Sequence, residues 1–272
     1  MTTATLRVLN PPAYPLYAQP TNRPMILLGA FALTFLLVAV YFFLIELLDR
    51  TLRDRIRSER ITKVPVMGCF PKESNLRYRR YNKTISEMAL KQLSKALLPH
   101  FKTGQQNVLN LISTDSSNGK SYLAQELETY WISIGLQVRR LTYDEDFLAE
   151  DSRYLLASDI KDLCSDILPD EIAIVEYPNL NEHPMSPALL NMGTVNLMVT
   201  RANRTWKDVD QKALRETIEM LEDKSTLYMY LTEASRYAVE EFVGQLPPYT
   251  AFKNFVYRIS QLGLTATENE RV

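Results

Sequence analysis

The residues best suited to chemistry form the tripeptide Gly119-Lys120-Ser121, which follows the polar run 114–118. A phosphate-binding loop has the pattern Gly-x-x-x-x-Gly-Lys-Ser/Thr. Its backbone N–H groups surround the phosphates, its lysine contacts the β- and γ-phosphates, and its hydroxyl binds Mg²⁺. The second half of the pattern is present, but Thr114 stands where the first glycine belongs. We predict that Gly119, Lys120 and Ser121 form the nucleotide-binding residues, with Mg-ATP as the candidate cofactor, either in a working loop or in the remnant of one.

Two acidic residues downstream extend this candidate site. Phosphoryl-transfer enzymes hold their metal ion with a carboxylate at the end of a later strand. Glu176 stands at such a strand end, in the sequence IAIVEYPNL, and is one methylene longer than the usual aspartate. Asp144 follows another expected strand end. If the loop is active, we expect Ser121 and Glu176 to hold Mg²⁺, and Asp144 and Glu176 to be the catalytic acids.

Bulk composition excludes several other classes of function. The 272 residues carry a net charge of −1, so bulk charge gives no reason to expect nucleic-acid binding. The two cysteines, Cys69 and Cys164, are far apart and lack the spacing of metal ligands. A disulfide framework is therefore not predicted.

An uncharged run, MILLGAFALTFLLVAVYFFLI, extends over residues 25–45. A helix of this length spans roughly 30 Å, the thickness of a bilayer core. It is too long for the apolar region of a signal peptide and begins too late in the chain. We predict a transmembrane helix over 25–48. Basic residues are sparse before the span and dense between 50 and 63, which places the C-terminal side in the cytoplasm.

The segments on either side of this span are predicted from their composition. Five prolines in residues 1–24 indicate an extended extracytoplasmic stalk. Residues 49–80 are expected to form a basic helix, continuing from residue 46 to residue 60, and a linker. Within that linker, VPVMGCFP has the character of a short linker or an edge strand.

Helical and strand periodicities alternate in residues 81–246, which indicates an α/β domain with a mostly parallel sheet. Strands are predicted over 107–112, 136–142, 171–177, 194–200 and 226–231, with Pro178 ending the third. Helices are predicted over 85–98, 121–134, 152–163 and 206–221. Ligands bind such sheets at the carboxyl ends of the strands, where the Gly-Lys-Ser loop belongs. Residues 247–272 are expected to form a helix and tail, either packed on the domain or docked on a partner or membrane surface.

Together these segments resemble the C-terminal part of bacterial polysaccharide co-polymerases, the chain-length determinants, fused to a tyrosine-kinase-like P-loop domain. The sequence 9–24 resembles the proline-rich stretch before the family's second transmembrane helix, and 46–71 resembles its cytoplasmic exit and linker. The loop region 107–138 resembles Walker A, and 171–180 resembles Walker B. The resemblance implies a single-pass protein of the bacterial inner membrane, in contact with the lipid bilayer. It also implies homo-oligomers and partners in the polysaccharide polymerase or export machinery, with no role for nucleic acid.

The sequence departs from this family at most of its functional motifs. In the phosphate-binding motifs, Ser117 replaces a loop glycine, Glu176 replaces an aspartate, and Thr142 and Asp144 stand at the positions of an Asp-x-Asp motif. In the activation motif, Leu90 and Leu93 stand where the family has two arginines. At the C-terminal end, Tyr249 and Tyr257 stand where the family has a tyrosine cluster. The family's first transmembrane helix and periplasmic domain have no counterpart, so we expect either that the short tail 1–24 is translocated on its own or that the chain is the C-terminal part of a longer protein. These departures favour a degenerate nucleotide-binding domain with a regulatory or scaffolding role in exopolysaccharide or capsule biosynthesis, export and chain-length control. The alternative is an active membrane-anchored ATPase or protein tyrosine kinase.

Overall fold

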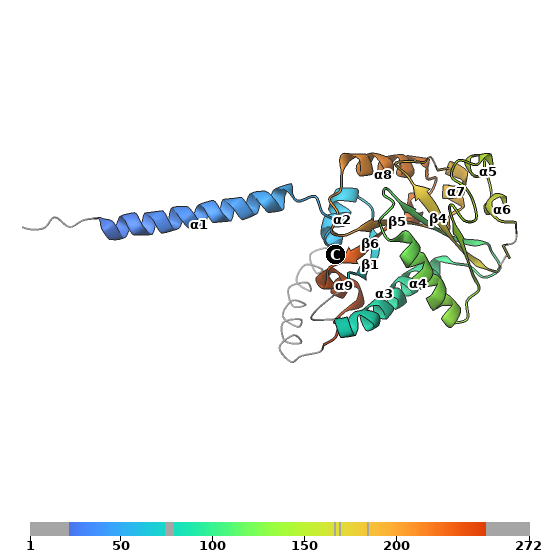
Figure 1. The fold of residues 1–272 in the computed structure, drawn as a ribbon, viewed down its shortest axis with the longest axis horizontal. Coiled ribbons are helices and arrows are strands. Elements are labelled where there is room, and N and C mark those ends of the chain that lie inside the picture. Colours follow the sequence, from blue (N-terminus) through green and yellow to red (C-terminus); the bar gives the residue numbers. More distant parts are fainter. Residues whose placement is uncertain (1–21, 74–78, 166, 169, 184, 249–272) are drawn as a thin grey trace, which may run out of the picture. The chain divides into compact units, whose positions relative to one another are not determined.

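The computed structural model describes residues 22–73, 79–165, 167–168, 170–183 and 185–248, drawn in colour in Figure 1. The chain divides into two compact units, one ending at Asp49 and one beginning at Arg50. Most of the predicted stalk and nearly all of the predicted C-terminal helix and tail, with Tyr249 and Tyr257, lie outside the described residues.

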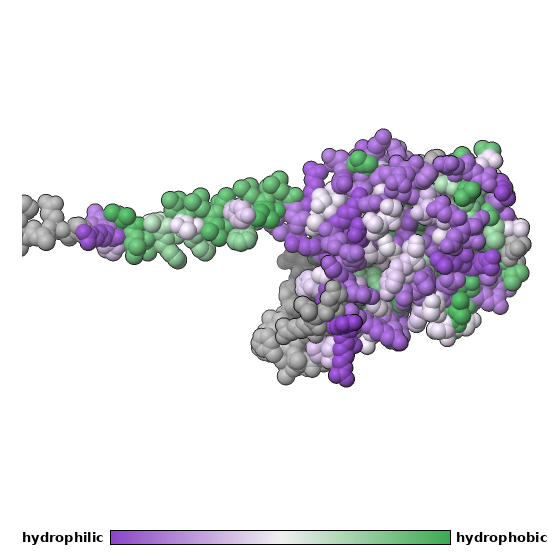
Figure 2. Space-filling model, viewed as in Figure 1, coloured by the Kyte–Doolittle hydropathy of each residue, from purple (hydrophilic) through white to green (hydrophobic). Residues whose placement is uncertain are grey.

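The first unit contains α1, the helix Arg23–Leu48. Proline at its second position suits the first turn, where no N–H group has to bond within the helix. An 18-residue window within its 26 residues has a mean hydropathy of 2.6, and none of the 26 residues is buried. Figure 2 shows the resulting apolar surface in green. Among the described residues, α1 is the one helix long and apolar enough to cross a bilayer, and it fits a single-pass membrane anchor.

The second unit is built on a six-stranded sheet in which every neighbouring pair is parallel. Its strands, in the order β1-β6-β5-β2-β4-β3, are β1 Val66–Pro71, β6 Leu227–Ala234, β5 Val195–Arg201, β2 Asn107–Ser113, β4 Ile172–Asn179 and β3 Val138–Thr142. The predicted α/β fold with a parallel sheet is confirmed. Every residue of β2 and β4 is buried, as expected for central parallel strands that are covered on both faces.

Helices cover both faces of this sheet (Figure 1). They are α2 Arg55–Thr62, α3 Asn82–Leu97, α4 Lys120–Ser133, α5 Ser152–Leu155, α6 Ile160–Leu163, α7 Pro187–Met192, α8 Asp208–Met220 and α9 Arg236–Val243. Alternate residues of β2 enter two different cores, because successive side chains of a strand point to opposite faces. Leu109 and Leu111 pack with α3 and α4, whereas Val108 and Ile112 pack in the core that contains residues of α5 to α8.

Two predicted helices are wrong in their continuity. The chain does not remain helical from residue 46 to residue 60, because α1 ends at Leu48 and α2 begins at Arg55. The carboxylate of Asp54 accepts a hydrogen bond from the Arg57 N–H, which makes Asp54 a helix N-cap and starts a new helix there. The predicted helix 152–163 is likewise two short helices, α5 and α6, each with an aspartate N-cap.

The predicted end of the third strand at Pro178 is also wrong. Strand β4 continues to Asn179, and its pairing with β2 shifts register between Leu111 and Ser113. From Leu111 to Ser113 the chain of β2 moves on by two residues, whereas the paired segment of β4, from Glu176 to Asn179, moves on by three. A proline cannot donate to the ladder and is tolerated at such a bulge. In the segment predicted as a linker or an edge strand, VPVMGCFP, residues 66–71 form the edge strand β1 beside β6.

Candidate functional site

The Gly-Lys-Ser loop lies at the carboxyl edge of the sheet, between the end of β2 and the start of α4. Neighbouring segments hold its backbone there. The hydroxyl of Thr232 on β6 donates to the Asn118 carbonyl over 2.7 Å, and the side-chain amide of Asn181 donates to the Thr114 carbonyl over 2.6 Å. The loop therefore occupies the position at which parallel sheets bind ligands.

Gly119 is needed for the conformation of this loop. Its φ of +80° lies in the left-handed region, which glycine adopts at little cost. A Cβ atom added there would lie 3.6 Å from the side chain of Thr232, an ordinary van der Waals contact. Backbone conformation, rather than lack of space, therefore selects glycine at the start of α4.

The first turn of α4 presents uncapped N–H groups to the loop. Its N-cap, Gly119, supplies no side-chain hydrogen bond, and no acidic residue lies in the first turn. Such a helix end favours anions, because its orphan N–H groups and the helix dipole both attract negative charge. Ser121 is exposed in this turn. This part of the site fits a phosphate group.

The side chain of Lys120 is held inside the protein. It is 4% exposed, and its ammonium group donates a hydrogen bond to the backbone carbonyl of Tyr177. The Nζ atom also lies 5.7 Å from the centre of the Tyr143 ring. Burial lowers the pKa of Lys120 to about 8, although the nearby charge of Glu176 opposes part of this shift. In this arrangement the charge of Lys120 is directed at the end of β4.

Glu176 is fully buried within β4, three residues before its end, and Arg140 neutralises its charge. The Arg140 Nη1 atom lies 3.1 Å from Glu176 Oε1, and the Thr142 hydroxyl donates to the same oxygen over 3.4 Å. Arg140 is also paired with Glu128 at 3.0 Å. One sequence signal pointed to this role, because arginines at positions 139 and 140 are unusual in a strand of a packed sheet.

This pairing bears on the predicted magnesium site. A cation at the Glu176 carboxylate would have to approach the guanidinium of Arg140, which repels it. Asp144 lies in the turn after β3 with φ +73° and is exposed, whereas Glu176 is buried. The metal role of Ser121 and Glu176 and the catalytic role of Asp144 and Glu176 stay predictions.

Two arginines that the sequence did not single out hold the side chains of the loop. Arg201, at the end of β5, donates to the Ser117 hydroxyl over 2.6 Å. Arg204, in the following turn, lies 3.4 Å from the carboxylate of Asp115. It also contacts the Thr114 hydroxyl at 3.4 Å and pairs with the buried Asp210 at 2.9 Å. These residues lie more than 80 positions beyond the loop in sequence, so only the fold brings them to it.

Some polar atoms near the loop have no hydrogen-bond partner among the described residues. They are both side-chain amide atoms of Asn118 and the Oε2 atom of Glu176, and both residues are 0% exposed. Burying a polar group without a partner costs about 1–3 kcal/mol. A polar ligand that reached these atoms would recover part of that cost.

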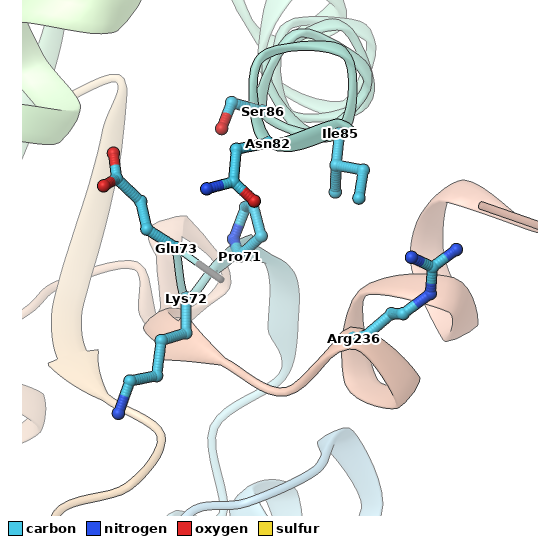
Figure 3. A pocket seen from close by; sticks show the side chains of 7 residues that line it. All are labelled: Pro71, Lys72, Glu73, Asn82, Ile85, Ser86 and Arg236. Carbon is cyan, nitrogen blue, oxygen red and sulfur yellow. The ribbon is translucent and has the colours of Figure 1, made fainter. Parts of the chain in front are cut away.

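Two hollows among the described residues lie away from this loop. The first is lined by Pro71, Lys72, Glu73, Asn82, Ile85, Ser86 and Arg236. Figure 3 shows Glu73 and Asn82 on one side of it and Arg236, which comes from α9, on the other. The second lies between the turn after β3 and the helices α5 and α6. Neither hollow is lined by Gly119, Lys120 or Ser121.

No protein-family model matches this chain, and no curated protein matches it. Solved structures with a similar arrangement include the kinase domain of the Escherichia coli tyrosine kinase ETK, at 11% identity and a TM-score of 0.48, covering 74% of this chain and 97% of that one. The chimerical protein CapA2B2 has 14% identity and a TM-score of 0.45, covering 67% and 100%. The BceF tyrosine kinase domain has 15% identity and a TM-score of 0.43, covering 66% and 99%. Similarity at this level does not establish a function for this chain.

Proposed function

We propose that this chain is a single-pass protein of the bacterial inner membrane whose cytoplasmic domain is a degenerate relative of P-loop domains. In this proposal it regulates or scaffolds the biosynthesis and export of an exopolysaccharide or capsule, including chain length, without catalysing phosphoryl transfer. The observation that carries the non-catalytic part is the position of Lys120, which is buried and bonded to the Tyr177 carbonyl. The polysaccharide role rests on the sequence resemblance of the segments 9–24, 46–71, 107–138 and 171–180.

The charges of the site support the absence of catalysis. Phosphoryl transfer needs a lysine on the phosphates and a carboxylate free to hold Mg²⁺. Here the lysine is engaged by β4, and the carboxylate of Glu176 is neutralised by Arg140. Losing one well-placed electrostatic contact typically lowers kcat by about a hundredfold to a thousandfold. The combined loss would leave a rate close to that of the uncatalysed reaction.

Two buried residues of α3 further support the proposal that this chain is not activated as a kinase. The resemblance places an activation motif at Glu87, with arginines expected at positions 90 and 93. The residues present, Leu90 and Leu93, are 3% and 1% exposed and pack in the core against the sheet. This helix therefore cannot present that motif to a neighbouring subunit. Any homo-oligomer, or any contact with a polymerase or export protein, must use other residues.

The alternative is an active ATPase or protein tyrosine kinase. It is favoured by the uncapped first turn of α4 and by Gly119, which keeps the loop conformation that accepts an anion. In an active protein, Lys120 would have to leave the Tyr177 carbonyl and turn to the bound phosphates. Residual nucleotide binding without turnover is compatible with the non-catalytic proposal.

The deciding experiment measures Mg-ATP binding and turnover on the full chain in lipid nanodiscs, beside Lys120→Ala and the matched variant Lys95→Ala on α3. We expect no turnover above background in any of the three proteins. Turnover that is lost in Lys120→Ala and kept in Lys95→Ala would overturn the proposal and establish that the protein is an ATPase or kinase.

The polysaccharide role is tested separately, by deleting the gene in its bacterium and measuring the amount and the length of the polymer. An unchanged polymer would remove that role.

A further inference from the structure

We propose that α2 is a lipid-binding helix, and that its outward face lies on the anionic headgroups of the membrane in which α1 is anchored. The inference depends on the membrane anchor and is independent of nucleotide chemistry. It rests on the face that α2 exposes, on the partners that Asp54, Glu59 and Glu241 have elsewhere, and on the short chain segment that follows α1.

One face of α2 packs on the domain, and the opposite face is exposed. Ser58 and Thr62 are 0% and 1% exposed, and their hydroxyls bond to backbone carbonyls, Ser58 to Leu52 at 3.1 Å and Thr62 to Ser58 at 2.7 Å. At about 100° per residue, the opposite side of the helix carries Ile56 and Arg60. Both are exposed, and Ile56 is 63% exposed.

One further basic residue extends this outward face beyond the C-terminal end of the helix. Lys63 is the C-cap and is exposed. Its spacing of three residues from Arg60 keeps it on the same side. We call Ile56, Arg60 and Lys63 the basic face. It combines two cations with one exposed aliphatic side chain, and cations close to an anionic leaflet are attracted to it.

The acids near α2 lie away from the basic face. The carboxylate of Asp54 caps the helix through the Arg57 N–H. Glu59 accepts hydrogen bonds from Arg55 at 3.0 Å and from the Val66 N–H at 3.1 Å, which directs it toward β1. Glu241 of α9 interacts with Asp54, Arg55 and Glu59, so it belongs to the inner side as well. These three acids are therefore engaged on the side of α2 that packs on the domain, and not by the cations of the basic face.

The length of the connecting segment determines where this surface can act. Only residues 49–54 separate the end of α1 from the start of α2. Six extended residues reach at most about 20 Å, so α2 begins close to the point where the chain leaves the bilayer. Each Lys or Arg near an anionic leaflet strengthens binding by roughly fivefold. The anionic leaflet is therefore the partner that the charge and the position of the basic face both fit.

The test uses the full chain in nanodiscs of phosphatidylcholine, alone or with phosphatidylglycerol, that contain a lipid-borne quencher. A fluorophore is placed at Ile56→Cys in a Cys164→Ser background. Cys69 is buried and burial raises the pKa of its thiol, so it reacts slowly. The control label is Leu156→Cys, which is 80% exposed and follows β3, at the opposite edge of the sheet from β1. We expect quenching at residue 56 that is several-fold stronger in anionic than in neutral discs, and little quenching at residue 156.

Charge-reversed variants separate charge recognition from simple proximity to the membrane. Arg60→Glu with Lys63→Glu should reduce the quenching at residue 56 in anionic discs to the neutral-disc value. The matched pair Lys91→Glu with Lys95→Glu, on exposed positions of α3, should leave it unchanged. If the first pair melts at a lower temperature than the parent, Arg60→Gln with Lys63→Gln provides the same comparison. Quenching that is equal in both kinds of disc, or no stronger at residue 56 than at residue 156, would overturn the proposal.

Discussion

The ammonium group of Lys120 donates a hydrogen bond to the backbone carbonyl of Tyr177, which joins the first turn of α4 to the end of β4. Tyr177 lies where the pairing of β4 with β2 shifts register, between Glu176 and Asn179. A residue whose sequence context suggests phosphate binding is thereby used to hold a helix on the sheet.

The pKa of Lys120, lowered to about 8 from 10.5, predicts that stability depends on pH. Between these two values the unfolded chain binds more protons at this residue than the folded chain, so the free energy of unfolding rises with pH. The full difference of 2.5 pH units corresponds to about 3 kcal/mol. Urea unfolding at pH 7.5 and pH 10 should show wild type gaining stability relative to Lys120→Met, which fills the same space without a charge. A constant difference between the two proteins would contradict the buried position of the ammonium group.

The ion pair of Arg140 and Glu176 predicts non-additive mutations. Arg140→Ala leaves the fully buried Glu176 carboxylate without its cation, and should lower the free energy of unfolding by about 3 kcal/mol. Adding Glu176→Gln removes the stranded charge, so the double variant should be more stable than Arg140→Ala alone. Chemical unfolding of the four proteins in this double-mutant cycle measures the coupling. Additive effects would mean that the pair contributes nothing to folding.

The left-handed backbone at Gly119 predicts that Gly119→Ala destabilises the protein by about 1–2 kcal/mol. The matched control is Gly104→Ala, because Gly104 has φ +74° and open space around it. Since a Cβ at residue 119 would also find room, both substitutions should cost about the same. A much larger cost at residue 119, measured by thermal unfolding, would mean that packing against Thr232 selects this glycine.

Restoring the first glycine of the loop is predicted not to restore catalysis. Thr114→Gly removes the contact with the Arg204 guanidinium, but Lys120 would still bond to Tyr177 and Arg140 would still neutralise Glu176. We expect Mg-ATP turnover by this variant to stay at background. Turnover that appears in Thr114→Gly and is lost on adding Lys120→Ala would show that the missing glycine was the only defect.

Local sequence was sufficient to determine several features of this protein. An uncharged run of membrane-spanning length has one favourable structure, a helix, because every backbone polar group must be satisfied within it. The alternation of buried strands with amphipathic helices leads to a parallel sheet for a similar local reason. The role of Gly119 at the start of the helix also depends on local sequence, because the left-handed backbone conformation favours glycine wherever it occurs.

The tertiary structure alone decided how the charged residues are used. Lys120 and Tyr177 are 57 positions apart, Arg140 and Glu176 are 36 apart, and Arg201 reaches Ser117 across 84. No local pattern encodes such pairs, since each depends on which strands become neighbours in the sheet. The same holds for Pro178, which a local rule places after a strand but which the bulge between β4 and β2 accommodates inside one. Sequence therefore determined the fold class, most of the helices and strands and the place of the loop, whereas the packing of strands β3, β4 and β5 around that loop decided which partner each charge has.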